Sequence, residues 1–246
     1  MKDHQVDLCG AEGAGRTPDM PLLERDSVFS FQCAGCGGCC RHREDIVLSG
    51  YDLYRLSRRL GLPPKLTARS FCRIYIGSVS HLPVLRLAPV KEEHNNCPFL
   101  TENRCAIHEA RPLVCALYPL GQEISPEGKV SYYFQSTRCG GQVYRATLSN
   151  YLEGQGIRER EPMDIRWAQC CMQLEQEASR WETDFHPVIL RRFRAKLCET
   201  LYYRYDTALP WLGQLEQNLV WLQAERTKLE QIQQNIHQKK RSKHSI

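Results

Sequence analysis

Residues 33–40 read Cys-Ala-Gly-Cys-Gly-Gly-Cys-Cys, which places four thiols within eight residues. Thiolates bind soft and borderline metal ions strongly, and several thiolates on one short loop lower the entropic cost of assembling a site. The intervening glycines Gly35, Gly37 and Gly38 allow the backbone to turn sharply and to approach the sulfurs. We therefore expect this loop to wrap around a metal ion or a metal cluster.

Further cysteines downstream extend the candidate ligand set. The turn residues 101–104 predict a tight hairpin with Cys97 and Cys105 on opposite arms. Pro112 is expected to open a short helix that carries Cys115 one turn inward, and a strand over 131–135 is expected to deliver Cys139. The candidate metal ligands are therefore Cys33, Cys36, Cys39, Cys40, Cys97, Cys105, Cys115 and Cys139.

This pattern resembles the CxxCxxCC family, cysteine-cluster proteins described as zinc- or iron-chelating domains. The resemblance covers about residues 29–142 and rests on Phe31, the 33–40 loop, Cys97-Pro98-Phe99-Leu100, the block from Cys105 to Cys115, and Tyr118-Pro119. It implies a metal-chelating function. His108 stands where the family usually has an aromatic residue, so that its imidazole, like that of His42 beside the loop, is either an extra ligand or a neighbour of the site.

Two kinds of metal centre fit the spacing. A structural zinc site takes four ligands in a tetrahedron, and eight cysteines suffice for two such sites. The C-x2-C-x2-C spacing also repeats the first three ligands of a bacterial ferredoxin loop, which favours a 4Fe–4S iron–sulfur cluster over zinc. In either case Arg41, Arg43 and Arg111 are placed to offset thiolate charge. The spacing is not that of radical S-adenosylmethionine enzymes, because no cysteine has partners four and seven positions further on.

Composition and charge indicate a cytoplasmic protein with reduced thiols. The 246 residues include 33 basic and 28 acidic side chains, and the excess lies in the tail from Lys239 to Lys243, so that nucleic-acid binding is not expected. No apolar run resembles a signal peptide or a membrane span. In a reducing compartment, thirteen cysteines argue against a disulfide framework.

The chain is expected to have an α+β fold, with an irregular cysteine-rich domain of short strands and helices followed by a mostly helical extension. We predict a flexible arm over 1–28, the metal-binding domain over 29–145, the helical extension over 146–236 and a basic tail over 237–246. Ser49 and Asp52 predict a capping box at the start of a helix that ends at Gly61. Asn150 is expected to cap a later helix, and 211–236 carries an apolar stripe that packs on the protein itself or on a protein partner.

Three classes of function remain open, and the sequence does not decide whether the protein is an enzyme. The first, which we favour, is a module that holds a metal or an iron–sulfur cluster. The second is a protein lysine N-methyltransferase using S-adenosylmethionine, because the same cysteine signature occurs in flagellin lysine N-methylase; a glycine-rich turn between a strand and a helix that would cradle this cofactor is not found. The third is a thiol-redox or metal-delivery protein that exchanges metal or electrons through Cys39 and Cys40.

Overall fold

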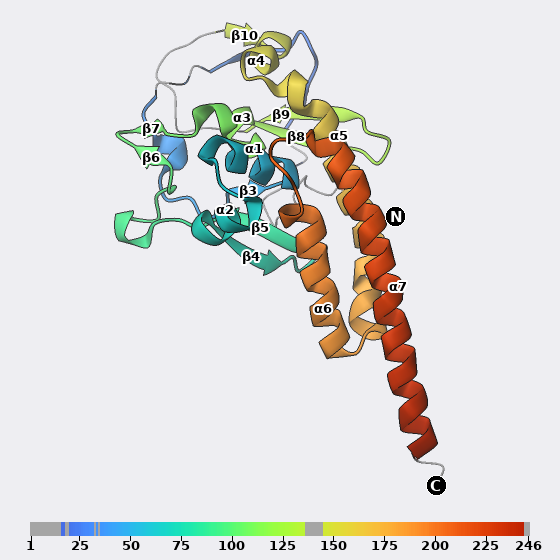
Figure 1. Ribbon diagram of the computed structural model, residues 1–246. Helices are drawn as coiled ribbons and strands as arrows, with labels where there is room; N and C mark the ends of the chain where they lie inside the picture. Colours follow the sequence, from blue (N-terminus) through green and yellow to red (C-terminus); the bar gives the residue numbers. More distant parts are fainter. Residues whose placement is uncertain (1–15, 18–19, 32, 34, 136–144, 244–246) are drawn as a thin grey trace.

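The computed structural model describes residues 16–17, 20–31, 33, 35–135 and 145–243. Short strands and short helices make up the first part of the chain, and long helices make up the last part (Figure 1), which confirms the α+β class. The strands are β1 (Leu22–Leu23), β2 (Val28–Ser30), β3 (Val47–Leu48), β4 (Cys72–Ile76), β5 (Pro83–Leu87), β6 (Leu100–Thr101), β7 (Arg104–Cys105), β8 (Leu120–Ile124), β9 (Val130–Phe134) and β10 (Arg145–Thr147). The helices are α1 (Gly50–Leu60), α2 (Pro64–Phe71), α3 (Leu113–Leu117), α4 (Leu148–Gly154), α5 (Ile157–Asp184), α6 (Pro187–Cys198) and α7 (Trp211–Lys243), with 3-10 turns at Gly38–Cys40, Lys91–Glu93 and His108–Ala110 and a π-helical turn at Glu199–Tyr203.

The strands form small antiparallel sheets rather than one large sheet. One sheet has the order β1-β9-β8 and another has the order β3-β5-β4, while β10 pairs with β2 and β6 pairs with β7. The β6–β7 hairpin confirms the turn predicted at 101–104. Its turn residues Glu102 and Asn103 have φ angles of 49° and 66°, and asparagine tolerates this left-handed region better than most residues do.

Helix α1 begins and ends as the sequence predicts. The Asp52 backbone N–H donates to Ser49 Oγ at 3.0 Å, and the Ser49 N–H donates to Asp52 Oδ2 at 3.0 Å. Gly61 ends the helix with a φ of 65°. At the N-terminal end the helix lies tightly against its neighbours, because a Cβ atom at Gly50 would meet the Trp167 ring at 2.7 Å and the Leu201 carbonyl oxygen still closer.

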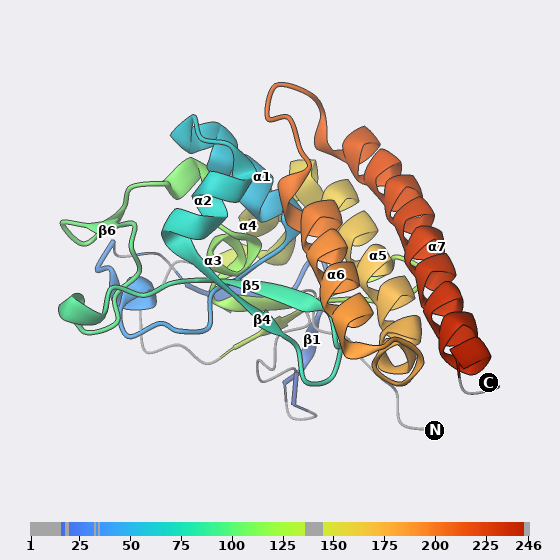
Figure 2. The same cartoon turned by 60° about the horizontal axis from the view of Figure 1, so that its bottom comes forward.

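One hydrophobic core joins the cysteine-bearing part of the chain to the C-terminal helices. Leu48 and Leu53 from the first part are buried in the same cluster as Trp167, Leu201 and Leu215 from the last part. Helices α5, α6 and α7 lie side by side along this core in both views (Figures 1 and 2). Burial of apolar surface is the main source of folding free energy, so that the two parts stabilise one another.

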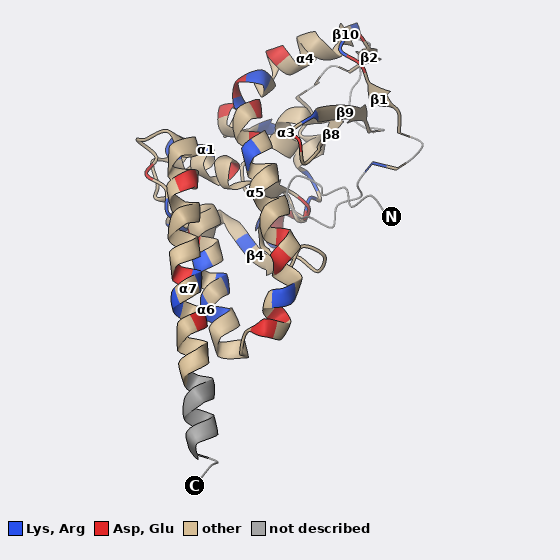
Figure 3. Ribbon diagram, turned by 90° about the vertical axis from the view of Figure 1, so that its right-hand side faces the viewer, with Lys and Arg blue, Asp and Glu red and all other residues tan. Residues whose placement is uncertain are grey.

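The apolar stripe of α7 is used within the molecule. Leu215, Leu222 and Leu229 are buried in the shared core, whereas Ile232, one turn further on, is 41% exposed. The helix continues past the predicted end at 236 to Lys243. Acidic and basic residues are interspersed along the C-terminal helices (Figure 3). Within the described part of the chain, every helix falls short of the length or the apolar character that a bilayer span requires.

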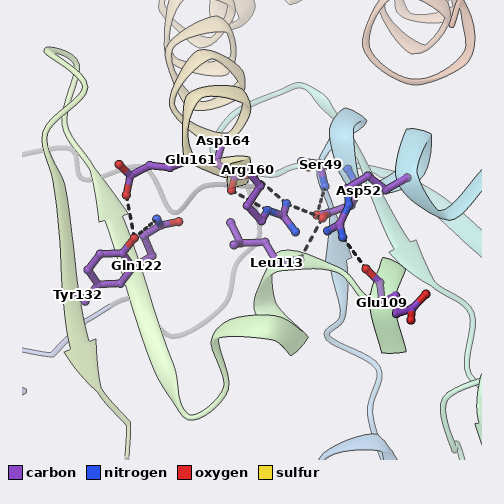
Figure 4. A network of polar contacts seen from close by, with 10 residues as sticks. Ser49, Asp52, Glu109, Leu113, Gln122, Tyr132, Arg160, Glu161 and Asp164 are labelled. Carbon is purple, nitrogen blue, oxygen red and sulfur yellow. Dashed lines mark hydrogen bonds and ion pairs between the residues drawn. The ribbon is translucent and has the colours of Figure 1, made fainter. Parts of the chain in front are cut away.

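A buried ion network connects α5 to α1 and α3 (Figure 4). Arg160 donates through Nη2 to Asp52 Oδ1 at 2.7 Å, and through Nε to Asp164 Oδ2 at 2.7 Å, and all three side chains are at most 3% exposed. The same Asp52 oxygen accepts a hydrogen bond from the Leu113 N–H at 3.0 Å. Burial raises the pKa of Asp164 to about 6, against the attraction of the guanidinium. The network fixes the start of α5 against the elements that flank the cysteines.

Candidate metal centre

The cysteine loop is held against the β6–β7 hairpin by backbone contacts. Gly37 adopts a φ of 69°, which favours glycine, and a Cβ atom there would lie 3.1 Å from the Asn103 carbonyl oxygen. The chain then forms the 3-10 turn at Gly38–Cys40. The Cys97 N–H donates to the Cys40 carbonyl oxygen at 2.8 Å, which joins the first cysteine group directly to the second.

Short local structures present the downstream thiols on the same side. Cys105 is the last residue of β7 and pairs with Leu100 of β6, whose N–H donates to the Cys97 carbonyl oxygen at 3.0 Å. Pro112 immediately precedes α3, one position before its predicted place in the first turn, and accepts a hydrogen bond from the Cys115 N–H at 3.0 Å. The hairpin and the short helix were both predicted, because their turn residues are local in the sequence.

These elements surround one cavity of about 860 Å³. Cysteines from three separate segments line its wall, and each of them is a free thiol in the structure. The cysteines lining the cavity are Cys33, Cys39, Cys40, Cys97, Cys105 and Cys115. The thiols of Cys39 and Cys40 lie 3.9 Å apart. The structure therefore brings together six of the eight cysteines that were predicted as ligands.

The cysteine thiols around the cavity change one another's pKa values, because they lie close together. The hydrogen bond to Cys40 and then burial raise the pKa of Cys39, and burial and the Cys40 thiol raise the pKa of Cys115. The hydrogen bond from Cys39 lowers the pKa of Cys40, but the hydrogen bond to Cys97 and burial outweigh it, and the pKa becomes about 11. The hydrogen bond from Cys40 in turn lowers the pKa of Cys97. Several thiolates cannot coexist here unless positive charge is supplied, and a metal ion is one source of such charge.

Basic side chains also face the cavity. Arg43 lines the wall, donates to the Cys39 carbonyl oxygen at 3.3 Å and pairs with Asp45 at 2.6 Å. Arg111 lines it as well and contacts His108 Nε2 and Gln155 Oε1. Both arginines were predicted to offset thiolate charge, and their positions fit that role, since a centre with four thiolates on one divalent ion is anionic.

Other predicted residues lie apart from this group. Cys36 is exposed and is not part of the cavity wall; its sulfur accepts a hydrogen bond from the Gly38 N–H at 3.4 Å. Cys139 lies outside the described residues. His42 is exposed and stands off the wall, whereas His108 lies on the wall, where burial and then the Arg111 charge lower the pKa of its imidazole.

The thiols surround the cavity without forming a closed coordination shell. Among the residues that the structure describes, no group of three or more Cys, His, Asp or Glu side chains is arranged as a ready-made metal site. The donor set itself, thiols with guanidinium neighbours, is nevertheless the one that zinc, iron and iron–sulfur centres use.

An aromatic wall completes the cavity, and the sequence analysis missed it. The rings of Phe31 and Tyr118 lie 5.8 Å apart and those of Phe31 and Tyr151 lie 6.4 Å apart, and all three residues line the cavity. The Tyr151 hydroxyl donates to the Tyr118 carbonyl oxygen at 2.5 Å. Tyr151 and Gln155 come from α4 and the residue after it, where no cysteine pattern signals a role.

The comparison with protein families identifies the same cysteine-bearing segment. Residues 32–139 match the CxxCxxCC family, described as "Putative zinc- or iron-chelating domain". The resemblance drawn from the cysteine spacing is therefore confirmed over this segment. The CxxCxxCC segment contains every cysteine that lines the cavity, and the description of the family supports a metal-chelating role.

The comparison with curated proteins gives one uncharacterized relative. The chain is 26% identical over 98 residues to the uncharacterized protein MJ0661 of Methanocaldococcus jannaschii, a match that covers 39% of this chain and 48% of that protein. The chain thus spans about half the length of the curated relative it matches. No solved structure matches the chain.

Proposed function

We propose that the protein holds an iron–sulfur cluster of the 4Fe–4S type in the thiol-lined cavity. The observation that carries this proposal is the convergence of free thiols from the 33–40 loop, the β6–β7 hairpin and α3 on one cavity. The eight predicted cysteines are the pool from which the ligands come. Cys39, Cys40, Cys97, Cys105 and Cys115 form its inner set, because each of them affects the pKa of another.

The space in the cavity supports a cluster. A 4Fe–4S cluster and a tetrahedral zinc ion each take four cysteine thiolates, which the inner set of five thiols can supply. A cavity of about 860 Å³ leaves room for several irons and inorganic sulfides, which a single ion does not need. When bound, such a cluster supplies one-electron transfer or a structural crosslink between the segments that ligate it. Arg43 and Arg111 offset its charge from the wall.

One distance favours a single ion instead, and it defines the second candidate. Two thiolates on the same tetrahedral zinc ion lie about 3.8 Å apart, as follows from a Zn–S bond of about 2.3 Å. The Cys39 and Cys40 sulfurs, 3.9 Å apart, match this spacing. In a 4Fe–4S cluster each iron takes one cysteine. A mononuclear zinc or iron site containing both Cys39 and Cys40 is therefore the alternative, and the protein is expected in the cytoplasm in either case because its thiols must stay reduced.

Metal analysis of protein purified without oxygen tests both candidates. We expect iron and acid-labile sulfide in equal amounts, with broad visible absorption, in the wild type. The variants Cys40→Ser and Cys115→Ser should lose most of this metal. Cys198→Ser is the matched control, because Cys198 is a partly buried thiol of α6 outside the cavity wall and should leave the metal content unchanged.

The outcomes separate the two candidates from a failure of both. A colourless protein with one zinc ion, lost in Cys40→Ser, overturns the cluster and supports the single-ion site. Equal metal content in the wild type and all three variants overturns any site in this cavity. Circular dichroism of each variant identifies loss of fold, and a folded Cys115→Ser protein without metal supports direct ligation.

A further inference from the structure

Residues 53–90 form a strongly basic stretch of the chain. They contain seven lysines and arginines and no aspartate or glutamate, so that this segment alone carries a formal charge of +7, against +5 for the whole protein. The remainder is slightly acidic, with 26 of the 33 basic side chains and all 28 acidic ones. The charge balance over the whole chain, in which the tail stands out, therefore hides a basic segment that runs from α1 to just past β5.

The structure exposes several of these cations on two adjoining elements. In α2, Thr67 and Ala68 are buried, whereas Lys65 and Arg69 are exposed on the opposite side of the helix. Helix α2 runs directly into β4, which carries the exposed Arg73, and Figure 2 shows both elements on the side turned toward the viewer. Within the described residues, none of these three cations forms an ion pair. Their charge is therefore available to an anionic partner.

A cross-strand pair of like charges lies in the same region. The register of β4 and β5 places Arg73 directly opposite Arg86. Like charges directly opposite each other on an antiparallel pair are destabilising. The guanidinium of Arg86 lies 5.5 Å from the centroid of the Tyr75 ring, which is a neutral neighbour and leaves the repulsion between the arginines uncompensated. A negatively charged group beside the two arginines offsets this repulsion, so that the surface is complementary to negative charge.

Exposed aliphatic side chains lie among the cations. Leu66, between Lys65 and Arg69 in sequence, is 48% exposed, and Val79 in the turn between β4 and β5 is 67% exposed. Ile74 of β4 is 43% exposed, although β4 is the edge strand of a sheet whose central strand is buried. Basic and aliphatic side chains exposed together are typical of surfaces that lie at the boundary between lipid headgroups and acyl chains.

We propose that α2, β4 and the turn after β4 form a docking surface for membranes that contain anionic phospholipids. The cations contact the headgroup phosphates and carboxylates, and the aliphatic side chains reach the acyl boundary. The backbone groups at the open edge of β4 stay in the hydrated headgroup layer, where water satisfies their hydrogen bonds. The residues of this lipid-docking surface are Lys65, Leu66, Arg69, Arg73, Ile74, Ile76 and Val79.

A nucleic acid fits this surface less well than a lipid membrane does. Its phosphates would use the cations but would leave the aliphatic side chains in water. Proteins that bind single strands also offer aromatic rings on which bases stack. Tyr75 is the aromatic residue of β4, and the Arg86 guanidinium already lies over its ring. The lipid-docking surface lies outside the wall of the thiol-lined cavity, so that this proposal is independent of the metal.

Co-sedimentation of the full-length protein with lipid vesicles tests the proposal. The protein should bind vesicles of phosphatidylcholine with phosphatidylserine, should not bind vesicles of phosphatidylcholine alone, and should dissociate as the salt concentration rises. The double variant Lys65→Glu/Arg69→Glu should weaken binding about tenfold or more, because each basic residue near an anionic surface contributes to the affinity. The matched control is Lys129→Glu/Arg145→Glu, which makes the same change of net charge at exposed positions next to β9 and in β10, away from β4 (Figure 1).

A second double variant separates lipid from nucleic acid. Leu66→Ser/Val79→Ser keeps the charge and should still weaken vesicle binding several-fold, because less apolar surface reaches the acyl boundary. Absence of wild-type binding to the anionic vesicles overturns the proposal, and so does equal weakening by Lys65→Glu/Arg69→Glu and by its control. A labelled oligonucleotide that binds more tightly than the vesicles, with no effect of Leu66→Ser/Val79→Ser on either ligand, assigns the surface to nucleic acid and also overturns it. All substituted side chains are exposed, and circular dichroism checks that each variant keeps the wild-type fold.

Discussion

Replacing Arg160 by methionine removes the cation of the buried network and keeps a side chain of similar length. Three hydrogen bonds disappear, two to Asp164 at 2.7 and 2.8 Å and one to Asp52 at 2.7 Å. Breaking a buried ion pair by removing one partner costs about 3–5 kcal/mol, because the other charge remains buried without compensation. Asp52 keeps the Leu113 and Ser49 N–H groups as hydrogen-bond donors, so that we expect Arg160→Met to lower the free energy of unfolding by about 3 kcal/mol.

Equilibrium urea unfolding at pH 7, followed by circular dichroism, measures this loss. Arg166→Met is the matched control on the same helix, since Arg166 makes a two-point ion pair with Glu216 whose side chain is 50% exposed. Such a surface pair contributes less than about 1 kcal/mol. The stability of Arg160→Met should therefore lie well below that of Arg166→Met.

The pH dependence gives a second measurement. Burial already raises the pKa of Asp164 to about 6 and Arg160 opposes that rise, so that without the guanidinium the folded-state pKa rises further and the folded variant binds a proton at higher pH than the folded wild type does. The variant then gains stability as the pH falls from 7 toward 5, and its deficit against the wild type narrows. A loss at pH 7 no larger than that of Arg166→Met, or a deficit that widens in acid, would refute the compensating role of Arg160.

Three further predictions concern single positions. Gly50→Ala should lower the free energy of unfolding in urea by about 1–3 kcal/mol, because its methyl group has no space beside the Trp167 ring. Gly213→Ala, in an open position of α7, should be neutral or raise the free energy of unfolding, and equal effects of the two substitutions would contradict the tight approach of α1. Thr147→Ala should lower the free energy of unfolding by about 1 kcal/mol, because Thr147 caps α4, and Asn150→Ala should lower it less. Thermal unfolding that ranks the two variants in reverse would assign the cap to Asn150. Burial raises the pKa of Cys170 from 9.0 to about 12, so that above pH 9 the unfolded state releases a proton that the folded state keeps. The free energy of unfolding should therefore fall between pH 8 and pH 10 by about 1.4 kcal/mol more in the wild type than in Cys170→Ala. Equal losses in the two proteins would contradict this prediction.

Local patterns account for the part of the fold that the sequence predicts correctly. The capping box of Ser49 and Asp52, the hairpin turn at 101–104 and the proline before α3 each depend on residues close together in the chain. The N-cap of α4 was predicted at Asn150 and is Thr147. Both residue types cap helices, and the choice depends on β10, whose pairing with β2 brings the chain to the helix start at Thr147.

Long-range packing accounts for what the sequence analysis missed. Arg160 and Asp52 are 108 residues apart, and nothing in either neighbourhood indicates that they meet. For the cavity, the cysteine pattern identified the cysteines that line it but did not indicate that Cys36 lies outside the wall. The backbone hydrogen bond from Cys97 to Cys40 joins residues far apart in the chain, and Tyr151 reaches the cavity because α4 packs beside Phe31.

Cys97 and Phe99 belong to the same buried cluster as Trp181 and Leu222 of the long helices, so that the cavity and the helices unfold together. Whatever occupies the cavity must then raise the melting temperature of helices that do not touch it, by mass action. A ligand present at about a hundred times its dissociation constant contributes about 2.7 kcal/mol in this way. Thermal unfolding followed by the far-UV circular dichroism of the helices therefore reports cavity loading even for a metal with no colour, and a strong chelator should lower the melting temperature.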